Sequence, residues 1–129
     1  MQERISQWFT RLIPPGLDYC SLRWVNKASE LMVVKKDVLQ PIQRRDDCGV
    51  MICVMHQGGL GYAATADLSE TGIARAIEQA GEWARVSSAR AVFDYSKVEM
   101  PGLAGEHFSV VRTPWESISL KDRIDVLRN

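Results

Sequence analysis

The fold is decided by residues 49–85, which read GVMICVMHQGGLGYAATADLSETGIARAIEQAGEWAR. Residues 49–56 carry apolar side chains at odd and even positions alike, so a strand formed here has two apolar faces. The two faces are Val50, Ile52 and Val54 on one side, and Met51, Cys53 and Met55 on the other. Such a strand is expected in the middle of a sheet, covered on both sides.

The residues after this strand predict a hairpin and then a helix. Gln57-Gly58-Gly59 makes the turn and residues 60–65 return as the next strand, with Gly61 allowing a close approach or a bulge. The apolar period then becomes helical over residues 70–86. Ser69 is the expected N-cap, and Leu68 and Ile73 have the spacing of a hydrophobic staple. The apolar face of this helix is Ile73, Ala76, Ile77, Ala80, Trp83 and Ala84.

Working outward, the flanking segments add strands and two helices. A helix is expected over residues 3–12, ended by Pro14-Pro15-Gly16, and a last helix capped by Ser119. Further strands are predicted at 18–25, 30–35 and 38–45, with turns at Lys36-Asp37 and Asp46-Asp47. Two more strands could form at 90–95 and 107–112, and the residues at 100–105 between them are expected to be a loop. The predicted fold class is α+β, a mostly antiparallel sheet of about five strands in a meander with helices packed on it, because the connections are too short for parallel pairing.

Composition excludes several classes of protein. The chain has 129 residues, the size of one domain, and its 16 basic and 16 acidic side chains cancel. No basic stripe argues for nucleic acid, and the longest apolar run, residues 50–55, is too short to cross a membrane. Cys20, Cys48 and Cys53 form no C-x-x-C pair, so reduced, buried thiols in a cytoplasmic protein are expected.

Few residues are candidates for chemistry. A zinc site needs three or four converging ligands, and His56, His107, Cys48 and Cys53 are the soft donors present. Their spacing favours turn and surface histidines with core thiols. Ser87, Ser88, Ser96 and Cys53 could be nucleophiles, but none stands in a catalytic motif. The sequence therefore indicates no catalytic and no metal residue.

Two further motifs have simpler explanations than ligand binding. The glycines of 58–61 join two strands, which favours a hairpin over a phosphate-binding loop leading into a helix. The charge run Arg44-Arg45-Asp46-Asp47 is expected to be a solvated turn, with contact to a partner subunit as the alternative.

Residues 18–23 read DYCSLR, and residues 61–69 read GYAATADLS. With these stretches, residues 18–85 resemble the N-terminal domain of the TldD/PmbA family, known as modulators of DNA gyrase and understood as zinc metalloproteases. The opening D-Y-a-[DE]-v-R of the family is matched at Asp18, Tyr19, Leu22 and Arg23. The following family pattern is matched at Gly49, Val50, Gly61, Tyr62, Ala63, Thr65, Asp67, Leu68 and Ser69. The tail PWESISLKDRIDVL, residues 114–127, is similar to the next family helix.

The resemblance implies a domain at residues 1–112 and, at 113–129, the start of a truncated helix or linker. It implies a larger C-terminal domain of the same parent protein, a second TldD/PmbA-type subunit and unfolded peptide as substrate. In the family, zinc is bound by a His-Glu-x-x-x-His segment and a distant cysteine of the C-terminal part. Neither His56 nor His107 stands in such a segment, so no zinc ligand is transferred to this chain and zinc belongs to the full-length protein.

Two hypotheses about function follow. In the first, the chain is the non-catalytic N-terminal domain of a metalloprotease subunit, and the neutral charge gives a link to gyrase no electrostatic support. In the second, it is a stand-alone peptide-binding or dimerisation module that captures an extended peptide at a sheet edge, for which the stretch around Pro41 is a candidate. A small-ligand enzyme complete in itself has no supporting group of residues.

Overall fold

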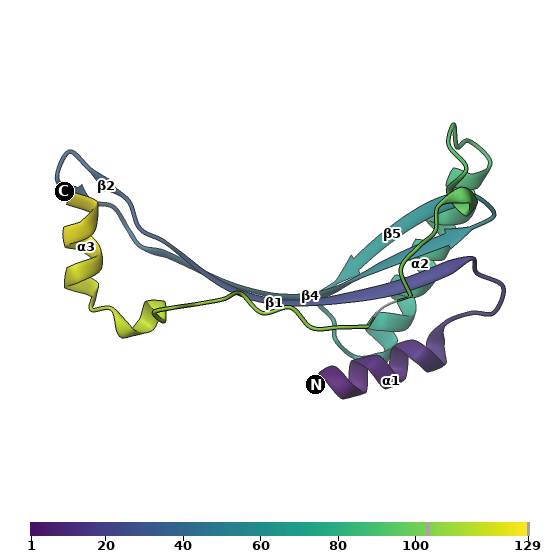
Figure 1. Ribbon diagram of the computed structural model, residues 1–129, viewed down its shortest axis with the longest axis horizontal. Coiled ribbons are helices and arrows are strands. Elements are labelled where there is room, and N and C mark those ends of the chain that lie inside the picture. Colours follow the sequence, from purple (N-terminus) through teal and green to yellow (C-terminus); the bar gives the residue numbers. More distant parts are fainter. Residues whose placement is uncertain (103, 129) are drawn as a thin grey trace. The chain divides into compact units, whose positions relative to one another are not determined.

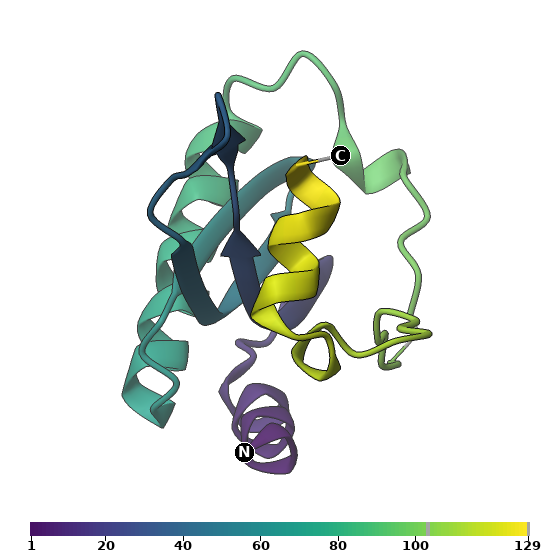
Figure 2. The same ribbon diagram turned by 90° about the vertical axis from the view of Figure 1, so that its left-hand side faces the viewer.

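The computed structural model describes residues 1–102 and 104–128 and confirms the α+β class (Figures 1 and 2). The helices are α1 (Gln2–Leu12), α2 (Glu70–Ser88) and α3 (Leu120–Arg128), and the strands are β1 (Tyr19–Leu31), β2 (Val34–Lys35), β3 (Val38–Leu39), β4 (Gln43–His56) and β5 (Gly59–Thr65). Two short 3-10 helices are η1 (Tyr95–Lys97) and η2 (Trp115–Ser117). Contacts divide the chain into a first unit, 1–27 with 47–101, and a second unit, 28–46 with 102–129.

The sheet of the first unit has the strand order β1-β4-β5, so β4 is central as expected. Strands β4 and β5 are antiparallel, with Val50 opposite Thr65 and His56 opposite Gly59. Between them, Gln57 and Gly58 have φ values of 48° and 77°. Two consecutive residues with positive φ make the tight turn whose twist suits a hairpin. The predicted hairpin is confirmed.

Helix α2 packs directly on β5, and the helix face predicted from the sequence builds the core. Its residues Ile73, Ala76, Ile77, Ala80 and Ala84 are buried together with Val50, Ile52 and Val54 of β4 and Ile5 of α1. Trp83 is the exception, because 54% of it is exposed. The sequence prediction was wrong at Trp83 because β5 presents glycines, which bring the helix axis close and leave no room for an indole beneath it.

Helix α2 begins after Ser69, which is its N-cap as predicted. The Ser69 side chain accepts a hydrogen bond from the backbone N–H of Gly72 at 3.1 Å, and Leu68 packs half-buried against the core that contains Ile73. The Ser69 hydroxyl thereby satisfies one of the N–H groups that have no partner within the helix.

Replacing Ser69 with alanine is therefore expected to lower the free energy of unfolding by about 1 kcal/mol, measured by urea denaturation followed by circular dichroism. Ser88→Ala is the matched control, since the Ser88 hydroxyl donates to the Arg85 carbonyl in the exposed last turn and caps no N–H. Its effect is expected to stay within about 0.5 kcal/mol. Equal losses in both variants would contradict the capping role.

The second face of β4 is covered at one end. Cys53 and Met55 are buried there, while Met51 is 36% exposed. The segment carrying η1 lies beside β5, and the Tyr95 N–H donates to the Gly58 carbonyl at 3.1 Å. The expected cover on both faces is thus present near the hairpin turn and missing at Met51.

The second unit is built on a narrow antiparallel hairpin. Strands β2 and β3 pair Val34 with Leu39, and the turn between them has Lys36 and Asp37 at φ values of 49° and 66°. The predicted turn at Lys36-Asp37 is therefore confirmed.

Several predicted strands differ from the structure. The strand expected at 38–45 is broken at 40–42, around Pro41, which has no N–H to donate. The strand expected at 30–35 is divided between β1 and β2. The Asp46-Asp47 turn was wrong, because both residues lie within β4. The segments 90–95 and 107–112 are not strands, whereas the loop at 100–105 is confirmed over its described residues.

The N-terminal and C-terminal helices are confirmed. Helix α1 lies against α2 and contributes its buried Ile5 to the core. Helix α3 begins after Ser119, whose hydroxyl oxygen accepts from the Asp122 N–H at 3.2 Å. Among the described residues, no helix is long and apolar enough to cross a membrane.

Candidate functional site

The most connected group of charged side chains lies in the second unit, around the carboxylate of Glu30. Its Oε1 accepts from Trp115 Nε1 at 2.9 Å and from Arg123 Nη1 at 2.5 Å, and its Oε2 accepts from Arg44 Nε at 2.5 Å. The Arg123 guanidinium also lies 5.0 Å from the centre of the Trp115 ring, a cation–π distance. These four residues are called the Glu30 cluster below.

The Glu30 cluster joins segments that are far apart in the sequence. Glu30 lies near the end of β1, Arg44 at the start of β4, Trp115 in η2 and Arg123 in α3. The side chains of Glu30 and Arg123 are each only 10% exposed. Because three donors occupy the two oxygens of the carboxylate, Glu30 is built to hold chain segments together and is poorly suited to accept a proton from a substrate.

The cluster changes the acidity of Glu30. The hydrogen bond from Trp115, followed by the one from Arg44, lowers the pKa of Glu30 below its ordinary value, and the charges of Arg123 and Arg44 act in the same direction. A folded-state pKa below the unfolded value means that this contribution to stability is fully present above the unfolded pKa of about 4.3. It is lost as the pH falls from there through the lowered folded pKa.

We therefore expect the Glu30 side-chain carboxyl to titrate below about pH 4.3, with the second unit losing its fixed structure over the same acidic range. Carbon-detected NMR of the Glu30 carboxyl carbon measures this, with Glu30→Gln assigning the signal. A midpoint at or above the ordinary glutamate value would contradict the three hydrogen bonds.

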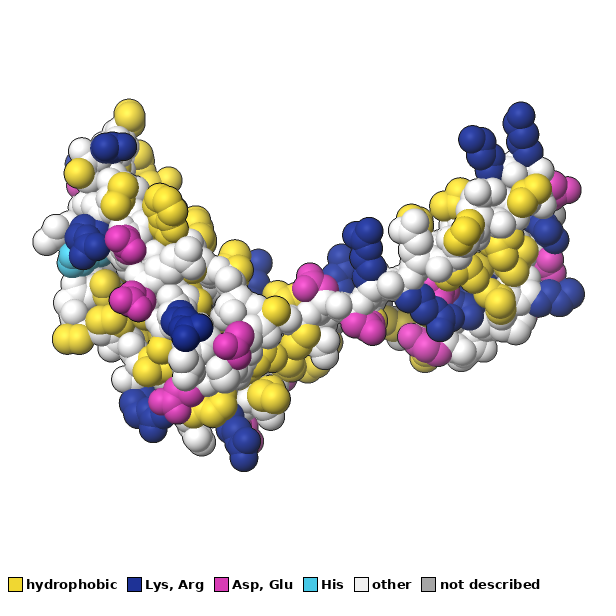
Figure 3. All heavy atoms as spheres, turned by 180° about the vertical axis from the view of Figure 1, so that it is seen from behind, with side chains coloured by type: hydrophobic (Ala, Val, Ile, Leu, Met, Phe, Trp, Pro, Cys, Tyr) yellow, Lys and Arg dark blue, Asp and Glu magenta, His cyan; other side chains and the backbone are white. Residues whose placement is uncertain are grey.

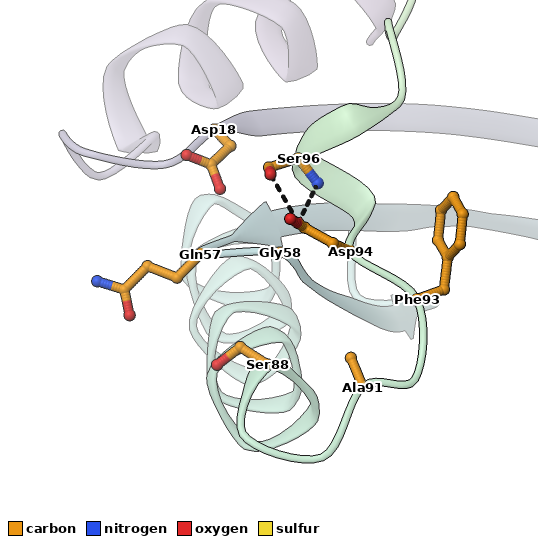
Figure 4. A pocket seen from close by; sticks show the side chains of 8 residues that line it. All are labelled: Asp18, Gln57, Gly58, Ser88, Ala91, Phe93, Asp94 and Ser96. Atoms are coloured by element: carbon orange, nitrogen blue, oxygen red, sulfur yellow. Dashed lines mark hydrogen bonds between the residues drawn. The ribbon is translucent and has the colours of Figure 1, made fainter.

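The first unit carries an open hollow of about 320 Å³ near the β4–β5 turn (Figure 4). It is lined by Asp18, Gln57, Gly58, Ser88, Ala91, Phe93, Asp94 and Ser96. The Asp94 Oδ1 accepts from the Ser96 N–H at 3.0 Å and from its hydroxyl at 2.6 Å. These bonds lower the pKa of Asp94 and use its carboxylate to cap η1. Ser88 and Ser96, two of the candidate nucleophiles, line the hollow with no histidine among its lining residues, so no catalytic triad is formed there.

Neither unit brings three of the candidate metal ligands together within the described residues. His56 ends β4, and its Nδ1 is buried without a hydrogen-bond partner, whereas His107 belongs to the second unit and is exposed. Within residues 1–102 and 104–128, no three His, Cys, Asp or Glu side chains come close enough to share a metal ion. The described residues therefore do not fit a zinc ion, which needs three or four protein ligands at one point.

Two of the three cysteine thiols, Cys20 and Cys53, have raised pKa values that make them unreactive. Burial raises the pKa of Cys20 to about 11 and also raises that of Cys53, which keeps both protonated at neutral pH. A protonated thiol is neither a nucleophile nor a metal ligand. The expectation of buried thiols was right for Cys53 and wrong for Cys48, which is exposed because β4 extends beyond the core there.

The glycines of the hairpin serve packing. A Cβ added to Gly61 would lie 2.0 Å from the Ala80 carbonyl oxygen, and one added to Gly59 would lie 2.0 Å from that of Ala84. The backbone of α2 fills the space that a phosphate would need. The third candidate nucleophile, Ser87, is also engaged here: its hydroxyl oxygen accepts from the Leu60 N–H at 2.9 Å, and the hydroxyl lies 2.8 Å from the Leu60 carbonyl oxygen.

Sequence reasoning missed the Glu30 cluster. It assigned Arg44 to a turn with Arg45, Asp46 and Asp47, and it gave Glu30, Trp115 and Arg123 no role. The pairing partners of Glu30 lie 14, 85 and 93 residues away, so no local spacing marks them. The available signal was the single carboxylate, Glu30, at the start of the apolar strand predicted at 30–35.

Comparison with known proteins identifies the family. Residues 20–84, which are 65 of the 129 residues, match the family model described as PmbA/TldA metallopeptidase domain 1. The match runs from β1 through β4 and β5 into α2. No curated protein is significantly similar to the chain. The chain therefore belongs to the PmbA/TldD metallopeptidase family, and residues 20–84 match the first, N-terminal domain of that family.

Proposed function

We propose that this chain is a non-catalytic domain of a PmbA/TldD-type metallopeptidase subunit, and that zinc binding and peptide cleavage lie in another part of the parent protein. The match to the first domain of that family supports this assignment. The observation that supports it is that, within residues 1–102 and 104–128, neither compact unit holds three His, Cys, Asp or Glu side chains placed to share a metal ion.

In this proposal the domain completes the fold of the subunit and helps to enclose the space where unfolded peptides are cleaved. Its partners are the C-terminal domain of the parent protein and a second TldD/PmbA-type subunit. The exposed apolar side chains of the sheet, Met51 and Tyr62, support a covered face in the complete protein. Figure 3 shows apolar side chains at the surface of each unit.

Zinc analysis of the purified chain, paired with cleavage of unfolded casein, tests this proposal. We expect far less than one zinc ion per chain after dialysis, and no cleavage when zinc is added. The double variant His56→Gln/His107→Gln is the control, since zinc bound through either imidazole disappears in it. Stoichiometric zinc that this variant loses, or casein cleavage by the chain alone, would overturn the proposal.

The gene gives an independent check. The proposal expects the parent reading frame to encode a His-Glu-x-x-x-His segment downstream of Asn129. A stop codon directly after Asn129 would contradict the role of this chain as one domain of a peptidase subunit.

A stand-alone peptide-binding or dimerisation module is the second candidate function. It is favoured by the position of β1 at the outside of the three-stranded sheet, since an outer strand offers unpaired backbone groups to an extended peptide. On the opposite outer strand, β5, the backbone N–H and carbonyl of Leu60 are already hydrogen-bonded to the Ser87 hydroxyl, so they are not available to a peptide. Titration of a flexible peptide followed by backbone amide NMR should shift β1 signals if this function is correct, and unchanged β1 signals would exclude it.

A further inference from the structure

The two units are stabilised in different ways. Every buried apolar side chain among the described residues lies in the first unit: Ile5, Val50, Ile52, Cys53, Val54, Met55, Ala63, Ile73, Ala76, Ile77, Ala80 and Ala84. In the second unit the apolar side chains are half-buried, as at Val34 and Ile124, or exposed, as at Leu31 and Val126. The second unit therefore lacks the dry apolar core that normally makes folding cooperative.

Polar contacts join the two parts of the second unit instead. One part is the hairpin of residues 28–46, and the other is the segment 114–128, called the clasp below, which contains η2 and α3. Trp115 and Arg123 of the clasp donate to Glu30, and α3 lies against β2. At the end of α3, Arg128 Nη2 donates to the Asp37 carbonyl oxygen at 3.3 Å, and Arg128 Nε lies 3.7 Å from the Asp37 carboxylate.

The contact at Asp37 is weaker than the contact at Glu30. The Asp37 side chain is 85% exposed, so water and salt screen its attraction to Arg128. Glu30 and Arg123 are largely shielded from water, and their charges attract more strongly at the same distance. Glu30 is therefore the main attachment point of the clasp.

The geometry points to residues 114–128 as a detachable clasp, which the Glu30 carboxylate holds closed against the hairpin and which opens as one piece while the first unit stays folded. The two oxygens of Glu30 bind different parts of the second unit: Oε1 accepts hydrogen bonds from the clasp, and Oε2 accepts one from Arg44 of the hairpin. Between η1 and η2, the described residues of 98–114 form no helix or strand, so the clasp can move without breaking any. Opening frees the side of β2 against which α3 lies.

Hydrogen exchange of the whole chain, read by mass spectrometry, tests the clasp. Glu30→Gln keeps the shape of the side chain but brings an NH2 group to a site where every neighbour is a donor. We expect amide exchange in α3 to become at least about tenfold faster, the factor that follows from losing one charged hydrogen bond. Exchange in α2 should stay as it is in the unchanged chain.

Two further variants make the result decisive. Trp115→Phe removes one donor to Glu30 and keeps the ring beneath Arg123, so it should speed exchange in α3 by less than Glu30→Gln does. Glu116→Gln changes the neighbouring residue of η2, whose side chain is exposed, and should change nothing. Unchanged α3 protection in Glu30→Gln would overturn the proposal. So would an α2 that loses protection together with α3, because the two units would then open together.

Discussion

Gly61→Ala is expected to destabilise the first unit by about 3 kcal/mol or more, a large part of the 5–15 kcal/mol that holds a typical domain together. A methyl group at this position would lie 2.0 Å from the Ala80 carbonyl oxygen and 2.4 Å from the Ala84 backbone nitrogen. Both atoms belong to the backbone of α2, which cannot turn aside as a flexible side chain can. The helix would have to lift away from β5, and the core between them would open.

Urea denaturation followed by circular dichroism measures the change, and Gly81→Ala is the matched control. Gly81 also lies in α2, but a methyl group there has nothing within 4 Å. Alanine is the better residue in a helix interior, so this variant should gain about 0.5–1 kcal/mol. The same substitution is thus expected to act with opposite signs at positions 61 and 81. A loss below about 1 kcal/mol at Gly61 would mean that α2 does not rest on β5 as closely as described.

The first unit was largely predictable because its main features are encoded locally in the sequence. The two-sided strand at 49–56, the turn at Gln57-Gly58 and the cap at Ser69 are each encoded within a few residues, and they agree with one another. A close approach was one of the two roles expected for Gly61, but the sequence did not say which element comes close. The sequence did not reveal how close the helix comes, which is what leaves Trp83 exposed.

The segment 107–112 shows where local reasoning fails. Phe108, Val110 and Val111 favour a strand, yet all three are exposed and the segment is not a strand. A strand needs a neighbour to accept its backbone hydrogen bonds, and β propensity mostly reflects packing against that neighbour. The opposite error occurred at Asp46-Asp47, where two turn-forming residues remain in β4 because both side chains are exposed there.

The candidate site was less predictable than the fold. The sequence predicted no metal site at His56, His107 or the three cysteines, because their spacing matches no ligand motif, and this stays a prediction. The Glu30 cluster depends on contacts between residues 85 and 93 positions apart, which no period or motif encodes. Such contacts become visible only when β1 and the segment 114–128 are placed in three dimensions.

The second large effect is expected at Ile52, and it tests which face of β4 this chain seals by itself. Ile52 is fully buried between the sheet and α2, so Ile52→Ala should lose about 2–5 kcal/mol through lost burial and the cavity that remains. The preceding residue of β4, Met51, points to the other face and is 36% exposed. Met51→Ala should lose less than about 1 kcal/mol, since its side chain already meets water. Urea denaturation of both variants compares the two faces of one strand.

The comparison between these neighbours also bears on the proposed partners. If the isolated chain is a monomer, the second face of β4 stays open at Met51, and the costs differ as stated. A Met51→Ala cost equal to that of Ile52→Ala would contradict an exposed second face, and sedimentation would then show whether a second copy covers it. In a complete subunit, where the proposal places another domain or chain on this face, Met51 should lose its exposure. The cost of Met51→Ala should then rise toward that of Ile52→Ala, because the methionine side chain would be removed from water on both sides.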